Sequence, residues 1–205
     1  GADCVIMQED PDGGEEEVRI FRSVSADSNI CWEGEEYQAG DLLLPGGQLI
    51  DAAAVAVAAG AGYRMLTVRQ QVKAVILSTG DELQQPGEDL YPGKIYDSNA
   101  AYLRVSLQQM GVEILDVCSV KDDTSRISAA INQYIGVADL ILTTGGVSVG
   151  QKDLMESAIL QSGGEILFHG LSMKPGMPTM LSVKDETLIL SLSGNPFSAA
   201  VPFVL

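Results

Sequence analysis

The sequence predicts an α/β fold in which a parallel β-sheet is covered by helices on both faces. From residue 71 onward, short apolar runs typical of buried strands alternate with segments of helical spacing. Strands and helices that alternate in this way form three layers, with the sheet in the middle. The strand ends carry glycine, hydroxyl and carboxylate residues, and in parallel sheets ligands bind at this edge.

The first 70 residues have a different character. Residues 1–40 predict part of a smaller β-rich domain, with strands at 4–7 and 18–21 joined by an acidic, glycine-containing hairpin loop at 9–17. Residues 41–70 predict a connector with a short helix at 51–59 and an extended stretch at 63–69. The sequence begins beside a strand-like run and stops inside an apolar helical run, so we expect it to be part of a longer protein.

The elements expected in residues 71–205 follow in order. The apolar runs predict strands at 72–77, 112–117, 138–143, 165–168 and 187–192. Helical spacing predicts helices at 98–110, 124–135 and 153–161. The helix at 98–110 is expected to bury one side bearing Tyr102, Val105 and Met110. The helix at 124–135 is expected to bury a face made by Ile127, Ala130, Ile131 and Tyr134.

Charge and cysteine content exclude several classes of function. The formal net charge is −16 and the sequence pI is about 4.2, which disfavours binding to nucleic acid or to anionic membranes. The three cysteines, Cys4, Cys31 and Cys118, show no CxxC spacing and are expected to be reduced and buried. Residues 1–10 lack the basic segment of a signal peptide, and no apolar run has membrane-spanning length. We therefore expect a cytoplasmic protein without membrane or nucleic-acid partners.

A glycine-rich loop at residues 143–153 is the most informative segment. It lies where a predicted strand passes into a predicted helix, and it contains Gly145, Gly146 and Gly150. Glycine lets a ligand approach backbone N–H groups, and a helix start adds unpaired donors and a positive dipole end. Ser148 and Lys152 add a hydroxyl and a cation. The loop is suited to hold an oxyanion, although many such loops only make a turn.

Four predicted strand ends bring polar residues to one edge of the sheet, at 78–82, 119–123, 144–146 and 193–196. The alternative for several of these groups is helix capping, for which Asp97 or Ser98, Asp123 or Thr124, Asp153, and Asn195 are well placed. Asp122 and Asp153 could instead share a divalent ion.

These segments, in this order and spacing, resemble a known family across nearly the whole chain. The matching motifs are Ser78-Thr79-Gly80-Asp81-Glu82, Gly93–Asn99, Asp122-Asp123, Gly145–Asp153, Met173-Lys174-Pro175-Gly176 and Gly194-Asn195-Pro196. They resemble the molybdopterin molybdenumtransferases, the MoeA / gephyrin E-domain family. The resemblance implies a MogA-like α/β domain at 71–205 and a C-terminal β-domain that this sequence does not include.

The resemblance implies an activity and a set of partners. It implies insertion of molybdate into adenylylated molybdopterin with release of AMP, dependence on Mg²⁺, a homodimer, and a MogA-type adenylyltransferase acting upstream. Asp122 and Asp153 would then hold the metal. The expected catalytic residues are Asp122, Asp153, Glu82, Lys174 and Glu36. The expected cofactor-binding residues are Thr79, Gly80, Asp81, Ser98, Asn99, Gly145, Gly146, Val147, Ser148, Gly150, Pro175, Gly176, Gly194, Asn195, Pro196 and Ser198.

The sequence departs from the family pattern at several positions. Met177 and Gly170 stand where the family has basic residues, and Glu36 stands where it more often has Asp. His169, the only histidine, could partly replace a lost lysine or could be structural. The departures leave open a diverged molybdopterin-binding carrier or sensor without insertase activity. An adenylyltransferase is disfavoured by residues 1–70 and by the Gly145–Gly150 motif, and the motifs are compatible with molybdate and with tungstate.

Overall fold

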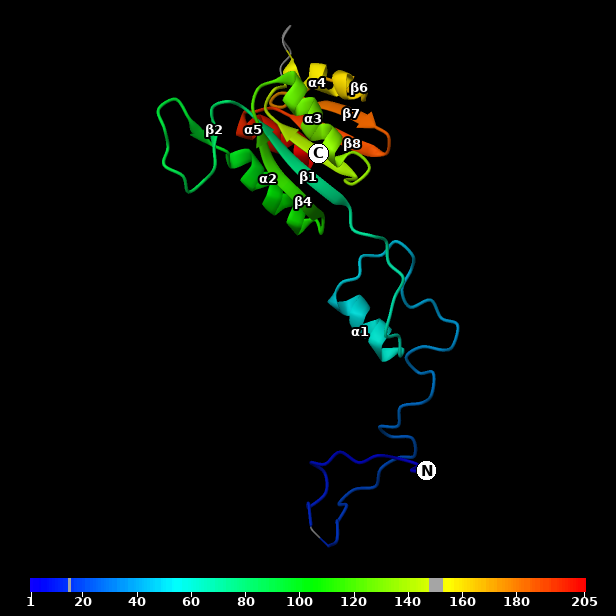
Figure 1. Ribbon diagram of the computed structural model, residues 1–205. Coiled ribbons are helices and arrows are strands. Elements are labelled where there is room, and N and C mark those ends of the chain that lie inside the picture. The colour runs from blue at the N-terminus through cyan, green and yellow to red at the C-terminus, as the bar shows by residue number, and fades with distance from the viewer. Residues whose placement is uncertain (15, 148–152) are drawn as a thin grey trace. The chain divides into compact units, whose positions relative to one another are not determined.

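The computed structural model describes residues 1–14, 16–147 and 153–205. The chain divides into two compact units, Gly1–Val68 and Arg69–Leu205, which are described separately below. Figure 1 shows the N-terminal unit in blue and cyan and the second unit in green to red. The division lies two residues before residue 71, where the sequence changes character.

The N-terminal unit contains one described helix, α1 (Ala52–Gly60), close to the predicted 51–59. Asp51 begins it as the N-cap, because its carboxylate accepts a hydrogen bond of 2.8 Å from the Ala54 N–H. The helix buries only the small side chains of Ala54 and Ala58. Small residues allow close approach of the neighbouring backbone, which explains the alanine-rich composition of this segment.

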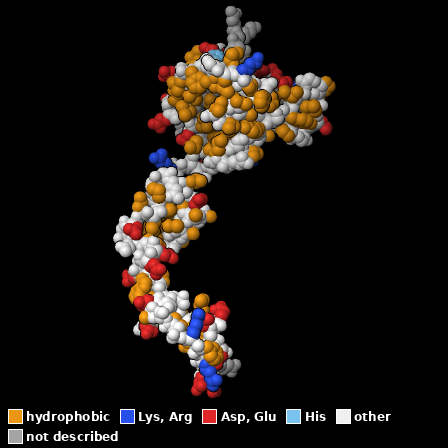
Figure 2. All heavy atoms as spheres, turned by 180° about the vertical axis from the view of Figure 1, so that it is seen from behind, with side chains coloured by type: hydrophobic (Ala, Val, Ile, Leu, Met, Phe, Trp, Pro, Cys, Tyr) orange, Lys and Arg blue, Asp and Glu red, His pale blue; other side chains and the backbone are white. Residues whose placement is uncertain are grey.

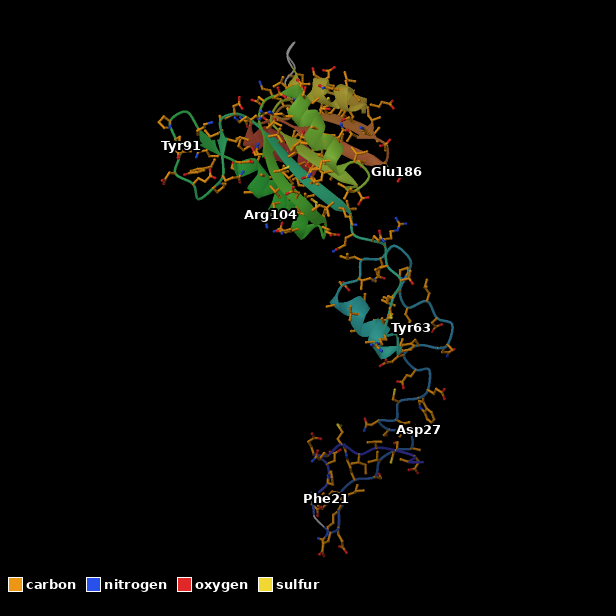
Figure 3. The ribbon with its side chains drawn as sticks, in the orientation of Figure 1. Phe21, Asp27, Tyr63, Tyr91, Arg104 and Glu186 are labelled. Atoms are coloured by element: carbon orange, nitrogen blue, oxygen red, sulfur yellow. The ribbon has the colours of Figure 1, made fainter. Side chains whose placement is uncertain are left out.

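The strands predicted at 4–7 and 18–21 are wrong for the described residues of this unit, which form only an isolated bridge between Pro11 and Ile20. An isolated hairpin is marginal unless a further layer covers its apolar face. Here such a layer does not form, since Phe21 is 74% exposed and Met7 55% exposed (Figure 3). Figure 2 shows hydrophobic side chains of this unit at the surface, interspersed with acidic ones.

The cysteines are free thiols, but the expectation that all three are buried is wrong. Cys31 is exposed, and Cys4 and Cys118 are partly buried. Cys31 belongs to the loosely packed N-terminal unit. Cys118 lies on an edge strand of the sheet described next, where one side lacks a neighbouring strand.

The second unit is built around a six-stranded sheet. The strand order is β4 (Glu113–Val120), β1 (Lys73–Thr79), β5 (Leu140–Thr144), β8 (Thr187–Leu192), β7 (Met180–Lys184) and β6 (Glu165–His169). The first four strands are parallel, whereas β7 is antiparallel to both of its neighbours. The predicted parallel sheet is therefore a mixed sheet, and β7 was not predicted. Because β7 reverses direction between β8 and β6, the strand β6 again ends at the same edge as β8.

Helices cover both faces of this sheet, as predicted. Helices α2 (Ser98–Gln109) and α5 (Pro196–Val204) pack on one face, where Leu103 and Ala199 join the core residues Ile76 and Leu142. Helices α3 (Thr124–Tyr134) and α4 (Leu154–Ser162) pack on the other, through Ile127, Ile131, Met155 and Ile159. Figure 1 shows the resulting three layers. The face predicted for the helix at 124–135 is confirmed, because Ile127 and Ile131 are fully buried.

The face predicted for α2 is wrong. Tyr102, Val105 and Met110 are 41%, 53% and 61% exposed, and the helix buries Ala100, Leu103 and Leu107 instead. Both sets have helical spacing. The structure buries the set whose side chains fit closely against the small residue Ala74 and against Ile76 of β1.

A short excursion between β1 and α2 was not predicted. It contains the two-residue strands β2 (Leu83–Gln84) and β3 (Ile95–Tyr96), which pair in parallel. The Gln84 side chain closes the intervening loop by donating to the Asp89 carbonyl at 2.9 Å and accepting from the Tyr91 N–H at 2.9 Å. The excursion sets the position at which α2 begins. Within the described parts of the chain, no helix has the length and hydropathy needed to cross a bilayer.

Candidate functional site

A pocket lies at the point where the strand order of the sheet reverses. The chain leaves β1 to form β4 on one side of it and later returns to form β5 on the other. In open α/β sheets, ligands bind in the crevice at the carboxyl ends of two such strands. The pocket has about 360 Å³ of empty space, part of it open to solvent. Its lining residues are Thr79, Glu82, Leu83, Ile95, Tyr96, Asp97, Ser98, Asn99, Thr144, Gly145, Gly194 and Pro196.

Asn99 holds three walls of this pocket together. It lies in the first turn of α2 and is 9% exposed. Its side-chain amide donates to the Thr144 hydroxyl at 2.7 Å and to the Gly194 carbonyl at 2.9 Å. The Thr144 hydroxyl in turn donates to the Ser193 carbonyl at 3.2 Å. The ends of β5 and β8 and the start of α2 are therefore linked through buried hydrogen bonds, which fix the shape of the pocket.

Gly145 and Gly146 allow the glycine-rich loop to pass directly over the end of β1. Both have positive φ angles, +89° and +67°. A Cβ atom at Gly145 would lie 2.1 Å from the Thr79 carbonyl oxygen, and one at Gly146 would lie 2.9 Å from the Thr79 hydroxyl. That hydroxyl is buried and has no hydrogen-bond partner among the residues that the structure describes. Buried polar groups are normally satisfied, so Thr79 has a donor and acceptor to offer beside the pocket.

Each of four helix starts is capped by one of the candidate residues, and Ser98 and Thr124 are not the caps. Asp97, Asp123, Asp153 and Asn195 each accept a backbone N–H bond at the start of α2, α3, α4 and α5 respectively. Helices α3, α4 and α5 follow strands that end at the same edge of the sheet, whereas α2 follows the excursion that contains β2 and β3. Capping accounts for Asp123, whereas Asp153 caps α4 and also contacts another side chain, described below.

A group of acidic side chains lies around Asp122. The Asp81 N–H donates to the Asp122 carboxylate at 3.4 Å, which joins the end of β4 to the segment after β1. Partial burial raises the pKa of Asp122, and the nearby charges of Glu82 and Asp81 raise it further, while the hydrogen bond from Asp81 lowers it. Like charges held together in this way favour a proton or a bound cation.

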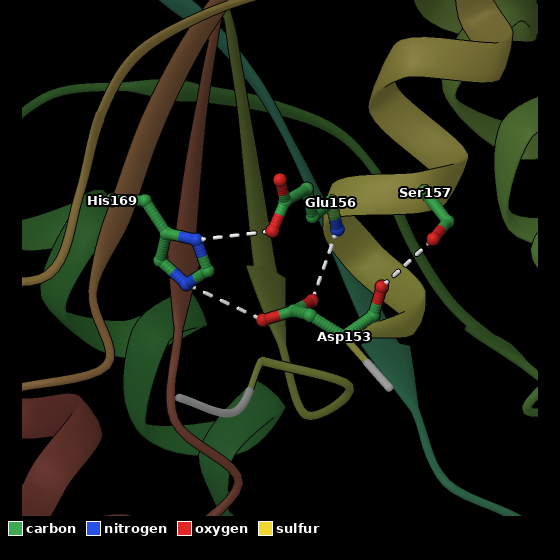
Figure 4. Close-up of polar contacts among 4 residues, drawn as sticks. All are labelled: Asp153, Glu156, Ser157 and His169. Atoms are coloured by element: carbon green, nitrogen blue, oxygen red, sulfur yellow. Dashed lines mark hydrogen bonds and ion pairs between the residues drawn. The ribbon is translucent and has the colours of Figure 1, made fainter. Parts of the chain in front are cut away.

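The carboxylate of Asp153 faces the imidazole ring of His169. The His169 Nε2 atom lies 3.3 Å from Asp153 Oδ2, and the Nδ1 atom lies 3.3 Å from Glu156 Oε2 (Figure 4). The Asp153 side chain is 3% exposed. Of the two acids predicted to share a metal, Asp122 lies near Asp81 and Glu82, and Asp153 lies beside His169.

Among the described residues, no cluster of three or more His, Cys, Asp or Glu side chains is arranged to hold a metal ion. Mg²⁺ needs fewer protein ligands, because it is usually bound by one or two carboxylates together with substrate phosphates and water. Asp122 fits this role best, since it is exposed and lies among carboxylates whose repulsion a cation would relieve. Asp153 is more engaged, because the Glu156 N–H donates to Oδ1 and the His169 Nε2 atom lies 3.3 Å from Oδ2.

The remaining predicted residues are not among those that line the pocket. Lys174, Pro175 and Gly176 are in the loop between β6 and β7, where a Cβ at Gly176 would lie 2.5 Å from the Pro202 side chain of α5. Asn195 and Ser198 are in the first turn of α5. Val147 packs in the core, so only its backbone could meet a ligand. Glu36 is exposed in the N-terminal unit, and Ser148 and Gly150 lie outside the described residues.

Sequence reasoning did not include Thr144, Tyr96 or His169 among the site residues. Thr144 could have been found, because it directly precedes Gly145 at a strand end and a buried threonine there must find a partner. Tyr96 lies in a two-residue strand that has no periodic signal. The partners of His169 are 13 and 16 residues earlier in the chain, and the contact depends on the unpredicted reversal at β7.

The mixed sheet, the glycine-rich loop and the pocket at the switch point define an α/β protein of the class that binds phosphorylated or nucleotide-like ligands at the carboxyl edge of its strands. The chain belongs to the family described as "probable molybdopterin binding domain", which it matches over residues 75–205. Residues 1–62 match the family described as "MoeA N-terminal region (domain I and II)". The resemblance seen in the sequence is thereby confirmed.

Several relatives are similar over the whole chain. A molybdopterin molybdenumtransferase 2 of Mycobacterium tuberculosis is 35% identical over 99% of this chain and 51% of its own length. A molybdopterin molybdenumtransferase of Staphylococcus aureus is 34% identical over 100% of this chain and 49% of its own length. The chain thus spans about half the length of the curated relatives it matches.

Solved structures agree on the fold. A molybdopterin biosynthesis MoeA protein of Pyrococcus horikoshii superposes with a TM-score of 0.79 at 29% identity, covering 98% of this chain and 50% of that chain. The CinA protein of Thermoplasma acidophilum, at 16% identity and a TM-score of 0.55, covers 65% of this chain and 95% of that chain. The latter likeness shows the fold alone, and it supports the three-layer α/β domain predicted from the sequence.

Proposed function

We propose that the full-length protein is a molybdopterin molybdenumtransferase that takes adenylylated molybdopterin and molybdate and releases AMP. The observation that carries this proposal is the pocket at the switch point, whose walls are joined by Asn99, Thr144 and Gly194. The similarity to proteins named molybdopterin molybdenumtransferase supports the transfer of molybdenum to molybdopterin. Molybdopterin and its adenylyl group both carry phosphate, which suits a site built from helix starts and glycine backbone.

The reaction requires a positioned water with a base beside it, and it requires donors that hold the phosphate oxygens. Hydrolysis of the AMP–molybdopterin link requires a water whose oxygen attacks phosphorus while the bond to the bridging oxygen breaks. We propose that Asp122, with Glu82 beside it, orients this water and accepts its proton, because a carboxylate with a raised pKa suits general base work. Thr79 and the N–H group of Gly146 are proposed to hold phosphate oxygens, since the Gly145 N–H already donates to the Leu192 carbonyl at 3.1 Å.

Mg²⁺ is proposed to bind through Asp122, with Asp153 as a second carboxylate. When bound, it would neutralise charge on the phosphate oxygens. This matters for a chain whose formal net charge is −16, because an anionic ligand must otherwise approach against that charge. A homodimer, a MogA-type adenylyltransferase upstream and a cytoplasmic location are proposed as parts of the same biosynthetic role.

The test uses the full-length protein with adenylylated molybdopterin, Mg²⁺ and molybdate, and measures AMP by chromatography. Asp122→Asn is expected to lower the rate of AMP release by about a hundredfold or more. Asp123→Asn is the matched control. It changes the neighbouring exposed carboxylate in the same way, and asparagine caps a helix as well as aspartate does. Equal rates for the two variants would contradict the role of Asp122.

A binding protein without insertase activity is the second candidate, and Met177 is the observation that favours it. Its side chain is 48% exposed in the loop that also carries Lys174, where the resemblance leads one to expect a second cation. A carrier would bind adenylylated molybdopterin and release no AMP when molybdate is added. Molybdate-dependent AMP release that Asp122→Asn abolishes would exclude the carrier.

A further inference from the structure

His169 makes a two-sided contact with acids at the start of α4. It is the last residue of β6, and each of its ring nitrogens lies 3.3 Å from a carboxylate oxygen, Nε2 from Asp153 Oδ2 and Nδ1 from Glu156 Oε2. Figure 4 shows the two ring nitrogens facing the two carboxylates, each joined to one of them by a dashed line. Each ring nitrogen therefore has a carboxylate oxygen as its neighbour.

The contact with His169 adds to the hydrogen bonds that hold Asp153 at the start of α4. The other carboxylate oxygen, Oδ1, accepts from the Glu156 N–H at 3.0 Å, and the Asp153 carbonyl accepts from the Ser157 hydroxyl at 3.1 Å. With one oxygen held by the helix start and the other by His169, rotation of the carboxylate about its side-chain bonds would break a hydrogen bond. His169 therefore selects one orientation of the Asp153 side chain.

The fold does not need this contact to join α4 to β6. The two elements are already connected by the turn at Gly163 and Gly164, where the Gly164 N–H donates to the Ile159 carbonyl at 2.9 Å. Their packing runs through Ile159 and Ile166, which belong to the same core cluster. The His169 contact lies at the opposite ends of both elements, at the carboxyl edge of the sheet where the pocket also lies.

We propose that His169 is a positioning residue that fixes the carboxylate of Asp153 for binding of adenylylated molybdopterin. This inference rests on the proposed function. It also assigns His169 a role other than replacement of a lost lysine. Both ring nitrogens face carboxylates, so the ring acts on Asp153 and Glu156 instead of on an anionic ligand.

The first test measures the contact itself. His169 is the only histidine, so ¹⁵N labelling of histidine gives one unambiguous set of ring nitrogen signals. At a fixed pH, Asp153→Asn is expected to shift the Nε2 signal most and Glu156→Gln the Nδ1 signal most. Glu165→Gln, an exposed acid on the same strand as His169, is the control and should shift neither. Ring signals that do not respond to Asp153→Asn would overturn the proposal.

The second test measures whether the contact matters for binding. His169→Phe keeps a flat ring and removes both donors, and His169→Gln keeps one donor. The phenylalanine variant of the full-length protein is expected to bind adenylylated molybdopterin about tenfold more weakly, the size expected for a lost hydrogen bond to a charged group. The glutamine variant should recover most of that loss, which a merely structural role of the ring would not produce.

A double-mutant cycle separates positioning from direct contact. If His169 acts through Asp153, then His169→Phe should change the affinity by less than about twofold when Asp153 is already asparagine. A full tenfold loss in that background would show that His169 acts independently, and would overturn the proposal. Failure of the unaltered protein to bind adenylylated molybdopterin would refute the proposed function instead. The histidine signals would still report whether His169 holds Asp153.

Discussion

The close passage of Gly145 over the end of β1 leads to a quantitative prediction for Gly145→Ala. The added methyl carbon would lie 2.1 Å from the Thr79 carbonyl oxygen, whereas ordinary contact begins at 3.4 Å. The two backbone segments would have to separate by about 1.3 Å, the difference between these two distances. The obstacle is backbone, so a change of side-chain rotamer cannot relieve it.

The expected cost has two parts. An alanine with φ near +89° costs about 1–3 kcal/mol, and forcing a methyl group into a closely packed site costs about another 1–3 kcal/mol. We therefore expect Gly145→Ala to lower the free energy of unfolding by about 2–6 kcal/mol. The control is Gly136→Ala, which also has a positive φ of +73° but has no atoms within 4 Å of the added carbon. The free energy of unfolding of Gly136→Ala should fall only by the cost of the positive φ, about 1–3 kcal/mol.

The assay is urea unfolding followed by far-UV circular dichroism, which reports mainly the second unit because most helices and strands lie there. The single tryptophan, Trp32, is in the N-terminal unit, so its fluorescence follows that unit separately. The fluorescence transition should be unaffected by either variant. If Gly145→Ala is no more destabilising than Gly136→Ala, the loop does not pass over Thr79 as described, and this wall of the pocket is wrongly placed.

Three further predictions concern the pocket and its charges. Asn99→Ala should destabilise the second unit by about 1–3 kcal/mol, because it leaves the Gly194 carbonyl without its donor, while the exposed Gln108→Ala on the same helix should cost less than about 0.5 kcal/mol in the same urea assay. The pKa of Asp122 is raised in the folded protein, so the folded state binds the proton more tightly, and stability falls as pH rises through and above the ordinary value of 3.8. Urea titrations at a series of pH values should therefore show Asp122→Asn gaining stability over the unaltered protein as pH rises, and a gain that grows toward low pH would contradict the assignment. Met177→Lys should strengthen molybdate binding by about fivefold in isothermal titration, an effect that 0.5 M salt should largely remove.

The order of strands and helices in residues 71–205 could be predicted because the decisive segments are strongly periodic. The strand at 187–192 was predicted with its observed bounds, and Ile127 and Ile131 identify the buried face of α3. Where two faces of one helix had similar spacing, as in α2, the sequence offered no means to choose. The choice depends on which side chains fit against β1, and that is a property of the assembled core.

The candidate site could be predicted in part for a similar reason. Residues at strand ends, such as Thr79, Gly145 and Gly194, follow from the rule that parallel strands end at one edge, and all three line the pocket. Contacts that depend on strand reversal could not be predicted in this way. The contact of His169 with Asp153 requires β7 to run antiparallel, and β7 is a short strand with only partial alternation of apolar residues.

The residues that cap the four helices at the sheet edge stabilise the fold, but the charged ones among them lower the affinity of this edge for anions. Aspartates at the starts of α2, α3 and α4 each stabilise their helix by about 0.3–1 kcal/mol through the helix dipole. The same three charges cancel the positive potential that these helix ends would otherwise offer to a phosphate or a molybdate. Helix α5 differs, because its cap is the uncharged Asn195 and a proline follows it. An anion entering this edge would meet the least repulsion at α5, and a gain in folding stability from a charged cap there would be a loss in binding.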